Sequence, residues 1–395
     1  MIRWQLFTRV TASIIAACCA SMADAQSNTR AKADFRAFNR ISDMFADFDD
    51  WHGPVTNLGI APQISWTRDT GENTNVVTGS LAMSSYTWIT PTLTTIIDLS
   101  IDQVSDPARD ETLIFNGEGL GLDDMYFLWS DQRVGLQGGI FTVPFGTAWN
   151  TLPGVFDTTL VSDYQFDGRV GGIASLSTGN TGGGVHELQA GIFTIDGSFL
   201  SKTVMTGSGP AETDDVVGGD GGASWVVTYA ASELSLIAPS FGYQVGFISQ
   251  SAATSDGPRE NAISASFEWT LPLDGDTDST VDARFFSVTP SFEYVHFADW
   301  QGVDGASADY YTPGLSFNYG DWEMDFAATW TNGDDGTALT DAVLLSTTLS
   351  YTFFSPQTQL QFGYAYQETN GVPDHLIGVQ INMPINVLSY GLLGR

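Results

Sequence analysis

From residue 58 to the C-terminus, the chain is divided into segments in which apolar and polar residues alternate. An alternation of period 2 predicts β-strands with one apolar and one polar face. The connections between these segments are alternately short, as at Gly320-Asp321, and mostly longer, as at residues 196–221. Bacterial outer-membrane barrels have short turns on the periplasmic side and longer loops outside. The pattern therefore predicts an all-β fold, an antiparallel transmembrane β-barrel of about 16 strands.

The two faces of the predicted strands differ clearly in polarity. Within 341–354, Leu345 and Leu349 share one face, whereas Ser346 and Thr348 share the other. About 16 strands enclose a lumen too wide to be filled by side chains. The apolar face must therefore be turned toward lipid. The predicted strands are 58–68, 76–88, 92–104, 123–130, 134–142, 169–178, 184–195, 222–232, 239–251, 262–272, 282–298, 308–319, 322–331, 341–354, 358–368 and 375–388.

The first residues have the features of a secretory signal. Arg3 and Arg9 make the region before the apolar run at 10–20 basic. Ala23-Asp24-Ala25 is a small-x-small cleavage site. We therefore expect cleavage near Ala25 and a location in the outer membrane of a Gram-negative bacterium. An alternative interpretation is a lipoprotein box ending at Cys18, although a spanning barrel needs no lipid anchor. The predicted parts are a signal peptide (1–25), an N-terminal helical segment (26–53) and the barrel (54–395).

Residues 28–50 are predicted to form a short amphipathic helix. Its apolar stripe, at helical spacing, consists of Phe35, Phe38, Ile41, Phe45 and Phe48. Two interpretations remain open. The helix lies against the mouth of the barrel, or it is a periplasmic oligomerisation segment, as would suit a homo-trimer.

The charge of the chain excludes some partners. There are 46 Asp and Glu residues against 14 Lys and Arg, and the formal net charge is −32 at pH 7. A nucleic-acid partner is not expected, because such proteins carry basic surfaces. The lysines are Lys32 and Lys202 alone, which is unusual for a soluble protein of this size. Both cysteines, Cys18 and Cys19, lie in the signal, so no disulfide or thiolate metal site is expected.

Acidic residues dominate the predicted polar face of the strands. Among the basic residues, Arg169 clearly falls on this polar face. These carboxylates could simply hydrate a wide lumen, or they could form an acidic lining that favours cations. The predicted lumen-facing acids are Asp98, Asp102, Glu187, Glu268, Glu293, Glu323 and Asp325.

The connection from Val143 to Gly168 is unusually rich in aromatic residues for a loop in water. We predict that it buries them by folding into the barrel, where it would narrow the pore; the alternative is an extracellular lid. Asp157, Asp163 and Asp167 would then line the constriction beside Arg169. The aromatic residues of the connection are Trp149, Phe156, Tyr164 and Phe166.

The stretch from Gly138 to Gly146, with Thr159 to Asp163, resembles the strand-5 and loop-3 region of Gram-negative porins. It is similar to the phosphate-selective porin superfamily and to the siderophore porins, whose members tend to carry a short helical or coiled-coil segment before the barrel. The resemblance implies a channel for solutes. The chain departs from a phosphate-selective pore in lacking clustered Arg or Lys along the predicted lumen.

An enzymatic function is not expected. His52, His186, His296 and His375 lie on distant segments, and no G-x-S-x-G or H-E-x-x-H motif is present. No cofactor and no metal centre is predicted, although acidic loops at 214–220 and 334–335 could hold calcium or simply be solvated. The sequence thus predicts an outer-membrane porin for passive diffusion of small hydrophilic solutes or cations. The alternatives are a ligand-specific siderophore porin and a non-conducting adhesin or structural barrel anchored in outer-membrane lipid.

Overall fold

The computed structural model describes residues 53–103, 107–131, 133–152, 154–180, 183–195, 223–234, 240–251, 257–273, 286–334, 339–353 and 358–391. The predicted signal peptide, the predicted helix at 28–50 and the acidic loop at 214–220 lie outside these residues. No helix within the described ranges is long and apolar enough to cross a membrane.

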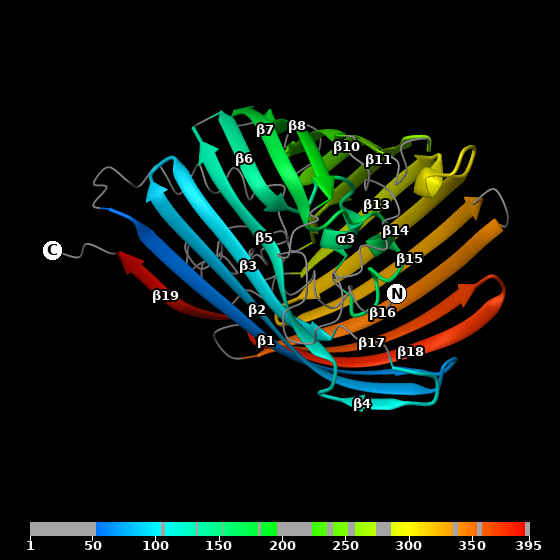
Figure 1. Ribbon diagram of the computed structural model, residues 1–395. Coiled ribbons are helices and arrows are strands. Elements are labelled where there is room, and N and C mark those ends of the chain that lie inside the picture. Colours follow the sequence, from blue (N-terminus) through cyan, green and yellow to red (C-terminus); the bar gives the residue numbers. More distant parts are fainter. Residues whose placement is uncertain are drawn as a thin grey trace.

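The described chain forms one closed antiparallel barrel of 16 strands, as predicted (Figure 1). Two short strands, β4 and β12, are additions to the wall, and β18 and β19 are consecutive parts of the last spanning strand. The strands are β1 (Val55–Asp69), β2 (Thr74–Thr90), β3 (Leu93–Gln103), β4 (Thr112–Ile114), β5 (Glu118–Ser130), β6 (Val134–Phe141), β7 (Arg169–Asn180), β8 (Gly184–Ile195), β9 (Ser224–Ser232), β10 (Phe241–Gln250), β11 (Glu260–Trp269), β12 (Leu271–Pro272), β13 (Phe286–Ala298), β14 (Ser307–Tyr319), β15 (Trp322–Asp334), β16 (Leu339–Phe353), β17 (Thr358–Thr369), β18 (Val372–Asn382) and β19 (Ile385–Gly391).

The barrel is closed by the first and last strands. β1 pairs with β2 along its whole length and with β18 and β19 on its other edge. The partners of β1 include Asn382, opposite Gln63, and Gly391, opposite Val55. A closed ring leaves no sheet edge unpaired, which is what a sheet in lipid requires.

The faces of the strands follow the predicted alternation. On β16, Leu345 and Leu349 are 44% and 42% exposed on the outside, whereas Thr348 and Ser350 are buried inside. Aromatic side chains gather near strand ends on the outer face, for example Trp322 and Tyr351, whose ring centroids lie 4.7 Å apart. Amphipathic rings at this position suit the boundary between lipid and water.

One irregularity changes the predicted alternation. Asp98 of β3 lies opposite Asp124 of β5, but the next residue, Leu99, lies opposite Leu122. Asp123 is therefore the extra residue of a β-bulge, which re-aims the side chains on either side of it. The predicted strand at 123–130 began inside this bulge, whereas β5 begins at Glu118.

The connection between β6 and β7 lies inside the ring of strands (Figure 1). It contains two short helical pieces, α3 (Ala148–Thr151) and the 3-10 turn η1 (Val161–Tyr164). A further 3-10 turn, η3 (Trp300–Gly302), lies between β13 and β14. We call residues 142–168 the inner segment.

Candidate functional site: the inner segment and the acidic wall

The inner segment is held by an apolar core that fills part of the barrel. Val143, Phe145, Val161 and Tyr164 are fully buried, and Phe166 is nearly so. Burying a large apolar side chain stabilises a fold by about 1.5–3 kcal/mol. Five such residues explain why these aromatic and branched side chains leave water and fold inward.

The inner wall is apolar where it receives this segment. Inward positions that would be polar in an open lumen are instead occupied by apolar side chains from β8 to β14, which join the same core. The ring centroids of Phe145 and Phe297 lie 6.4 Å apart, and those of Tyr164 and Tyr310 lie 5.2 Å apart. The wall residues of the core include Phe193, Val226, Ile248, Val295, Phe297, Ala308 and Tyr310.

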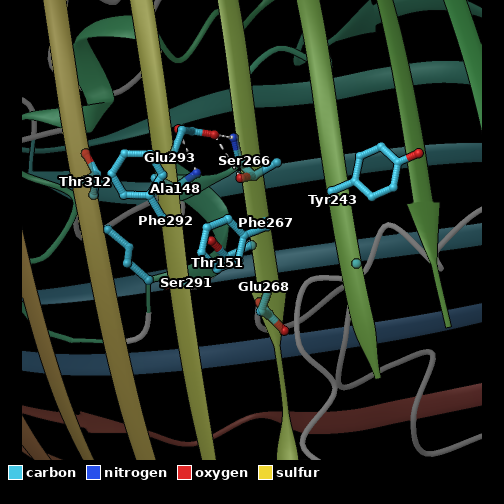
Figure 2. A pocket seen from close by; sticks show the side chains of 13 residues that line it. Ala148, Thr151, Tyr243, Ser266, Phe267, Glu268, Ser291, Phe292, Glu293 and Thr312 are labelled. Carbon is cyan, nitrogen blue, oxygen red and sulfur yellow. Dashed lines mark hydrogen bonds between the residues drawn. The ribbon is translucent and has the colours of Figure 1, made fainter. Parts of the chain in front are cut away.

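Glu293 of β13 anchors the segment through its carboxylate. The backbone N–H of Thr147 and the Thr147 hydroxyl donate to Oε2, the latter at 2.8 Å. The N–H of Ala148 and the hydroxyl of Tyr164 donate to Oε1 at 3.0 Å and 2.6 Å. Figure 2 shows Glu293 beside Ala148, at the start of α3. The carboxylate thus accepts backbone donors that the first turn of a helix leaves unpaired.

Tyr164 is suited to its role as a donor to Glu293. Burial raises the pKa of the Tyr164 phenol well above its ordinary value, and the neighbouring charge of Glu293 raises it further. The phenol therefore stays protonated and keeps its hydrogen bond to the carboxylate.

A second anchor lies on β16. Asp157 is fully buried and accepts hydrogen bonds from the Ser346 hydroxyl at 2.6 Å and from the N–H of Gly154 at 2.7 Å. The N–H of Val155 donates to the Thr348 hydroxyl at 2.8 Å. Phe156 packs nearby in a small cluster with Leu344 and Leu376 of the wall, among others. Asp157 and Phe156 thus hold the segment to the wall.

Glycines in the wall make room for the inner segment. A Cβ at Gly314 would come within 2.9 Å of Leu152, one at Gly363 within 2.6 Å of Val155, and one at Gly378 within 2.8 Å of Phe156. Each distance is shorter than a real side chain tolerates. The segment therefore fits notches on β14, β17 and β18.

The other predicted residues of the segment have separate surroundings. Asp163 is exposed and accepts a hydrogen bond from the Tyr310 hydroxyl at 3.1 Å. Asp167 accepts from the Thr142 hydroxyl at 2.8 Å and from Gln165 at 2.9 Å. The indole N–H of Trp149 donates to the carbonyl of Phe145 at 2.9 Å.

The buried Arg169 contacts the segment from β7. Its guanidinium carbon lies 5.9 Å from the centroid of the Phe166 ring. A guanidinium at this distance from an aromatic ring is attracted to its face.

An acidic wall is formed by β3 and β5. The Ser100 hydroxyl donates to Asp123 at 3.0 Å, and the N–H of Thr142 donates to Asp124 at 3.0 Å. The charges of Asp98, Asp124 and Asp167 act on Asp123, so these four carboxyl groups share one neighbourhood. Sequence reasoning identified Asp98 and Asp167 but missed Asp123 and Asp124, because strict alternation cannot place consecutive residues inside. Two consecutive acids within a strand were the available signal of a bulge.

The remaining predicted acids are spread around the inner wall. Asp102 lies near the outer end of β3 and accepts from the N–H of Gln103 at 2.8 Å. Glu187 accepts from Gln189 at 2.9 Å. Glu268 and Glu293 line the same small cavity beside α3 (Figure 2). Glu323 and Asp325 are buried on the inner face of β15. Within the described part of the chain, no group of three or more His, Cys, Asp and Glu side chains could hold a metal ion.

A closed barrel of 16 strands with a connection folded inside has the architecture of outer-membrane barrels of the porin type. The sequence matches no protein-family model and no curated protein.

Solved structures share the fold. OmpTdeltaL8, a loop deletion mutant of OmpT, an outer membrane protein of Vibrio cholerae, has a TM-score of 0.51 at 8% identity over 85% of this chain and 100% of its own. The outer membrane channel DcaP of Acinetobacter baumannii has a TM-score of 0.49 at 10% identity, over 84% of this chain and 98% of its own. OccD1 (OprD) has a TM-score of 0.47 at 9% identity, over 84% and 96%. At such identities the likeness concerns the fold alone.

Proposed function

We propose that the protein is a porin: a water-filled channel across a Gram-negative outer membrane, which small hydrophilic solutes cross by passive diffusion. The observation that carries the proposal is the inner segment. It is anchored to the inner wall through Glu293 and Asp157, and it narrows a barrel whose 16 strands would otherwise enclose a wide lumen.

The narrowed passage is proposed to run beside the acidic wall. The anchors and notches of the inner segment lie on β13, β14 and β16–β18. The carboxyl groups of Asp98, Asp123 and Asp124 lie on β3 and β5, and Asp167 joins them from the end of the segment. The passage between these elements is therefore proposed to be lined by carboxyl groups, which carry negative charge where they are ionised.

This charge supports a preference for cations. Fixed carboxylates in a narrow passage raise the local concentration of cations and repel anions. Salt screens the effect over about 10 Å at 0.1 M ionic strength, so the preference is expected to weaken in concentrated salt. The resemblance to phosphate-selective and siderophore porins implies an anionic or chelated ligand as the transported solute. An acidic passage disfavours such a ligand.

The test is the reversal potential of the purified protein in a planar bilayer under a potassium chloride gradient. We expect permeability to potassium over chloride, and a lower ratio for Asp123→Asn combined with Asp124→Asn. A matched control neutralises two acids at the exposed outer ends of β15 and β16, Asp334→Asn with Asp341→Asn, and should retain the wild-type ratio.

Two outcomes would contradict the proposal. An anion-selective wild-type channel would show that the acidic wall does not border the passage. A correctly folded barrel with no conductance would favour the alternative of an adhesin or structural barrel.

A further inference from the structure

Arg259, which directly precedes β11, lies on the outer face of the barrel wall. It has the same strand parity as Ile263, which is 47% exposed on that face. Its guanidinium reaches across β10 toward β9. Nε donates to the Ser249 hydroxyl at 3.0 Å, and Nη2 donates to the carbonyls of Ser249 at 2.9 Å and of Ala223 at 3.1 Å. These bonds fix the direction of the side chain, because they tie it to the ends of two neighbouring strands.

The fixed guanidinium keeps one edge available for a ligand. An arginine has five N–H donors, and three of those of Arg259 are used by Ser249 and Ala223. Within the described residues, the two N–H groups of Nη1 have no hydrogen-bond acceptor, and the side chain is partly exposed. A guanidinium binds phosphate oxygens well, because its planar donors match their geometry and its charge is permanent. The open edge of Arg259 is therefore suited to an anion.

An exposed apolar strip continues from Arg259 along the same face. Trp225 of β9 lies opposite Ser249, which holds the guanidinium. Trp225 is 41% exposed and stacks on Phe247 of β10, with ring centroids 4.9 Å apart and an interplanar angle of 27°. The strip continues toward the middle of the strands with the exposed side chains of Val227, Val245 and Ile263. A positive group at the head of an apolar strip matches a molecule with an anionic head and apolar chains.

The connections show which end of the barrel carries this site. The short turn at 181–183 joins β7 to β8 at one end, and β8 then runs to Ile195 at the other. The long connection 196–223 leads from there into β9, beside Ser249 and Arg259. Short turns lie on the periplasmic side in barrels of this type, and longer loops lie outside. Arg259 therefore lies at the outer leaflet, where Trp225 suits the boundary between lipid and water.

The charge of the chain makes this position distinctive. A formal net charge of −32 repels anionic headgroups, so a fixed positive group on the lipid face marks a place where one is attracted. A carboxylate on the same face, Asp309 of β14, is engaged by its neighbours. The Tyr294 hydroxyl and Nδ1 of His296 lie 2.7 Å and 3.0 Å from the same Asp309 oxygen. Of the possible anions, a lipid fits better than free phosphate, because only a lipid also covers the apolar strip.

We propose that β9, β10 and the start of β11 form a binding site for a phosphate-bearing lipid of the outer leaflet. The Nη1 edge of Arg259 binds the phosphate, and the lipid's acyl chains lie along Trp225, Phe247 and the strip beyond them. The bonds to Ser249 and Ala223 hold the guanidinium in place for this contact. The site goes beyond transport, since it requires a barrel in the membrane but no conductance.

The first experiment measures lipid bound to the purified protein by native mass spectrometry. The probe is lipid A carrying its phosphates, and parallel samples contain dephosphorylated lipid A or inorganic phosphate alone. We expect Arg259→Gln to bind lipid A about tenfold more weakly than the wild type, a loss on the scale of one charge-assisted hydrogen bond. The control Arg109→Gln removes an exposed arginine from the connection before β4 and should bind as the wild type does.

The second experiment changes the apolar part of the site and leaves Arg259 in place. Trp225→Ala should weaken lipid A binding about threefold, because it removes exposed apolar area from the contact. Its matched control is Trp322→Ala, at the opposite end of the barrel, where Trp322 is 49% exposed and packs on Tyr351 at 4.7 Å. This control should bind lipid A as the wild type does. These exposed positions keep the test valid if Arg259→Gln fails to fold, as judged by gel migration before and after heating.

Several results would overturn the proposal. Equal affinity of the wild type and a folded Arg259→Gln for lipid A would show that Arg259 does not hold the headgroup. Equal binding of dephosphorylated lipid A would show that phosphate is not recognised. Inorganic phosphate bound as tightly as lipid A would indicate an anion site with no role for the acyl chains. Equal effects of Trp225→Ala and Trp322→Ala would show that the lipid has no preferred place on the wall.

Discussion

Replacing Glu293 by Gln should loosen the inner segment. The carboxylate accepts hydrogen bonds from four donors, namely two on Thr147, one on Ala148 and one on Tyr164. The amide of Gln keeps one oxygen for two of these donors but turns an N–H₂ group toward the other two. Hydrogen bonds to charged groups contribute about 1.5–3 kcal/mol each, and a buried donor left unpaired costs about 1–3 kcal/mol.

These contributions are not additive, so we expect a loss of about 3 kcal/mol in the free energy that holds the segment on the wall. Since each 1.4 kcal/mol is a factor of ten, the ratio of displaced to anchored segment should rise by a factor of roughly 100. In planar-bilayer recordings this would appear as frequent transitions to higher conductance, which we expect to be rare in the wild type.

The control is Glu187→Gln, which makes the same chemical change on the inner face of β8. Glu187 accepts a hydrogen bond from Gln189 of its own strand and, among the described residues, has no such bond to the inner segment. The Glu187→Gln variant should show transitions to higher conductance as rarely as the wild type. Both variants must show the same shift in gel migration on heating, which establishes that each barrel is folded. If transitions to higher conductance were as rare in Glu293→Gln as in Glu187→Gln, Glu293 would not be an anchor of the segment.

Two further changes test how the inner segment fits against the wall and whether it narrows the passage. Gly378→Leu would bring a Cβ within 2.8 Å of Phe156, and overpacking of this kind costs about 1–3 kcal/mol. The variant should therefore show the same frequent transitions to higher conductance as Glu293→Gln. The control Gly138→Ala, whose Cβ would come no nearer than 3.9 Å to a wall carbonyl, should not show them. Wild-type recordings from Gly378→Leu would show that the notch is not needed. Deleting residues 151–166 should raise single-channel conductance and the size limit for neutral solutes in liposome swelling; an unchanged size limit would mean that the segment does not narrow the passage.

The architecture was predictable because it depends on local alternation. Which face of a strand meets lipid follows from the polarity of neighbours such as Leu345 and Ser346, and the number of strands follows from counting such segments. The bulge at Asp123 was not predictable in this way, because a single inserted residue shifts the alternation while leaving both flanking stretches regular.

The roles of the inward acids were less accessible. Alternation places Glu293 inside the barrel, but it cannot show that the inner segment lies against Glu293, since the two are distant in sequence. The same holds for Asp157, which meets Ser346 of β16 instead of standing in the passage. The wall glycines Gly363 and Gly378 could not be interpreted either, because their small size matters only once Val155 and Phe156 lie against them.

The seam between β1 and the pair β18 and β19 has a consequence for how the barrel forms. The strands that close the ring are the first and the last of the described strands. The chain entropy lost in closing the longest loop of the barrel is therefore lost when this one pairing forms. Until the final strand arrives, β1 carries an unpaired edge of backbone N–H and C=O groups that lipid cannot solvate. A chain that stalls before β18 therefore has no partly closed state of low energy in the membrane. We expect assembly to commit only when the last strand reaches the first.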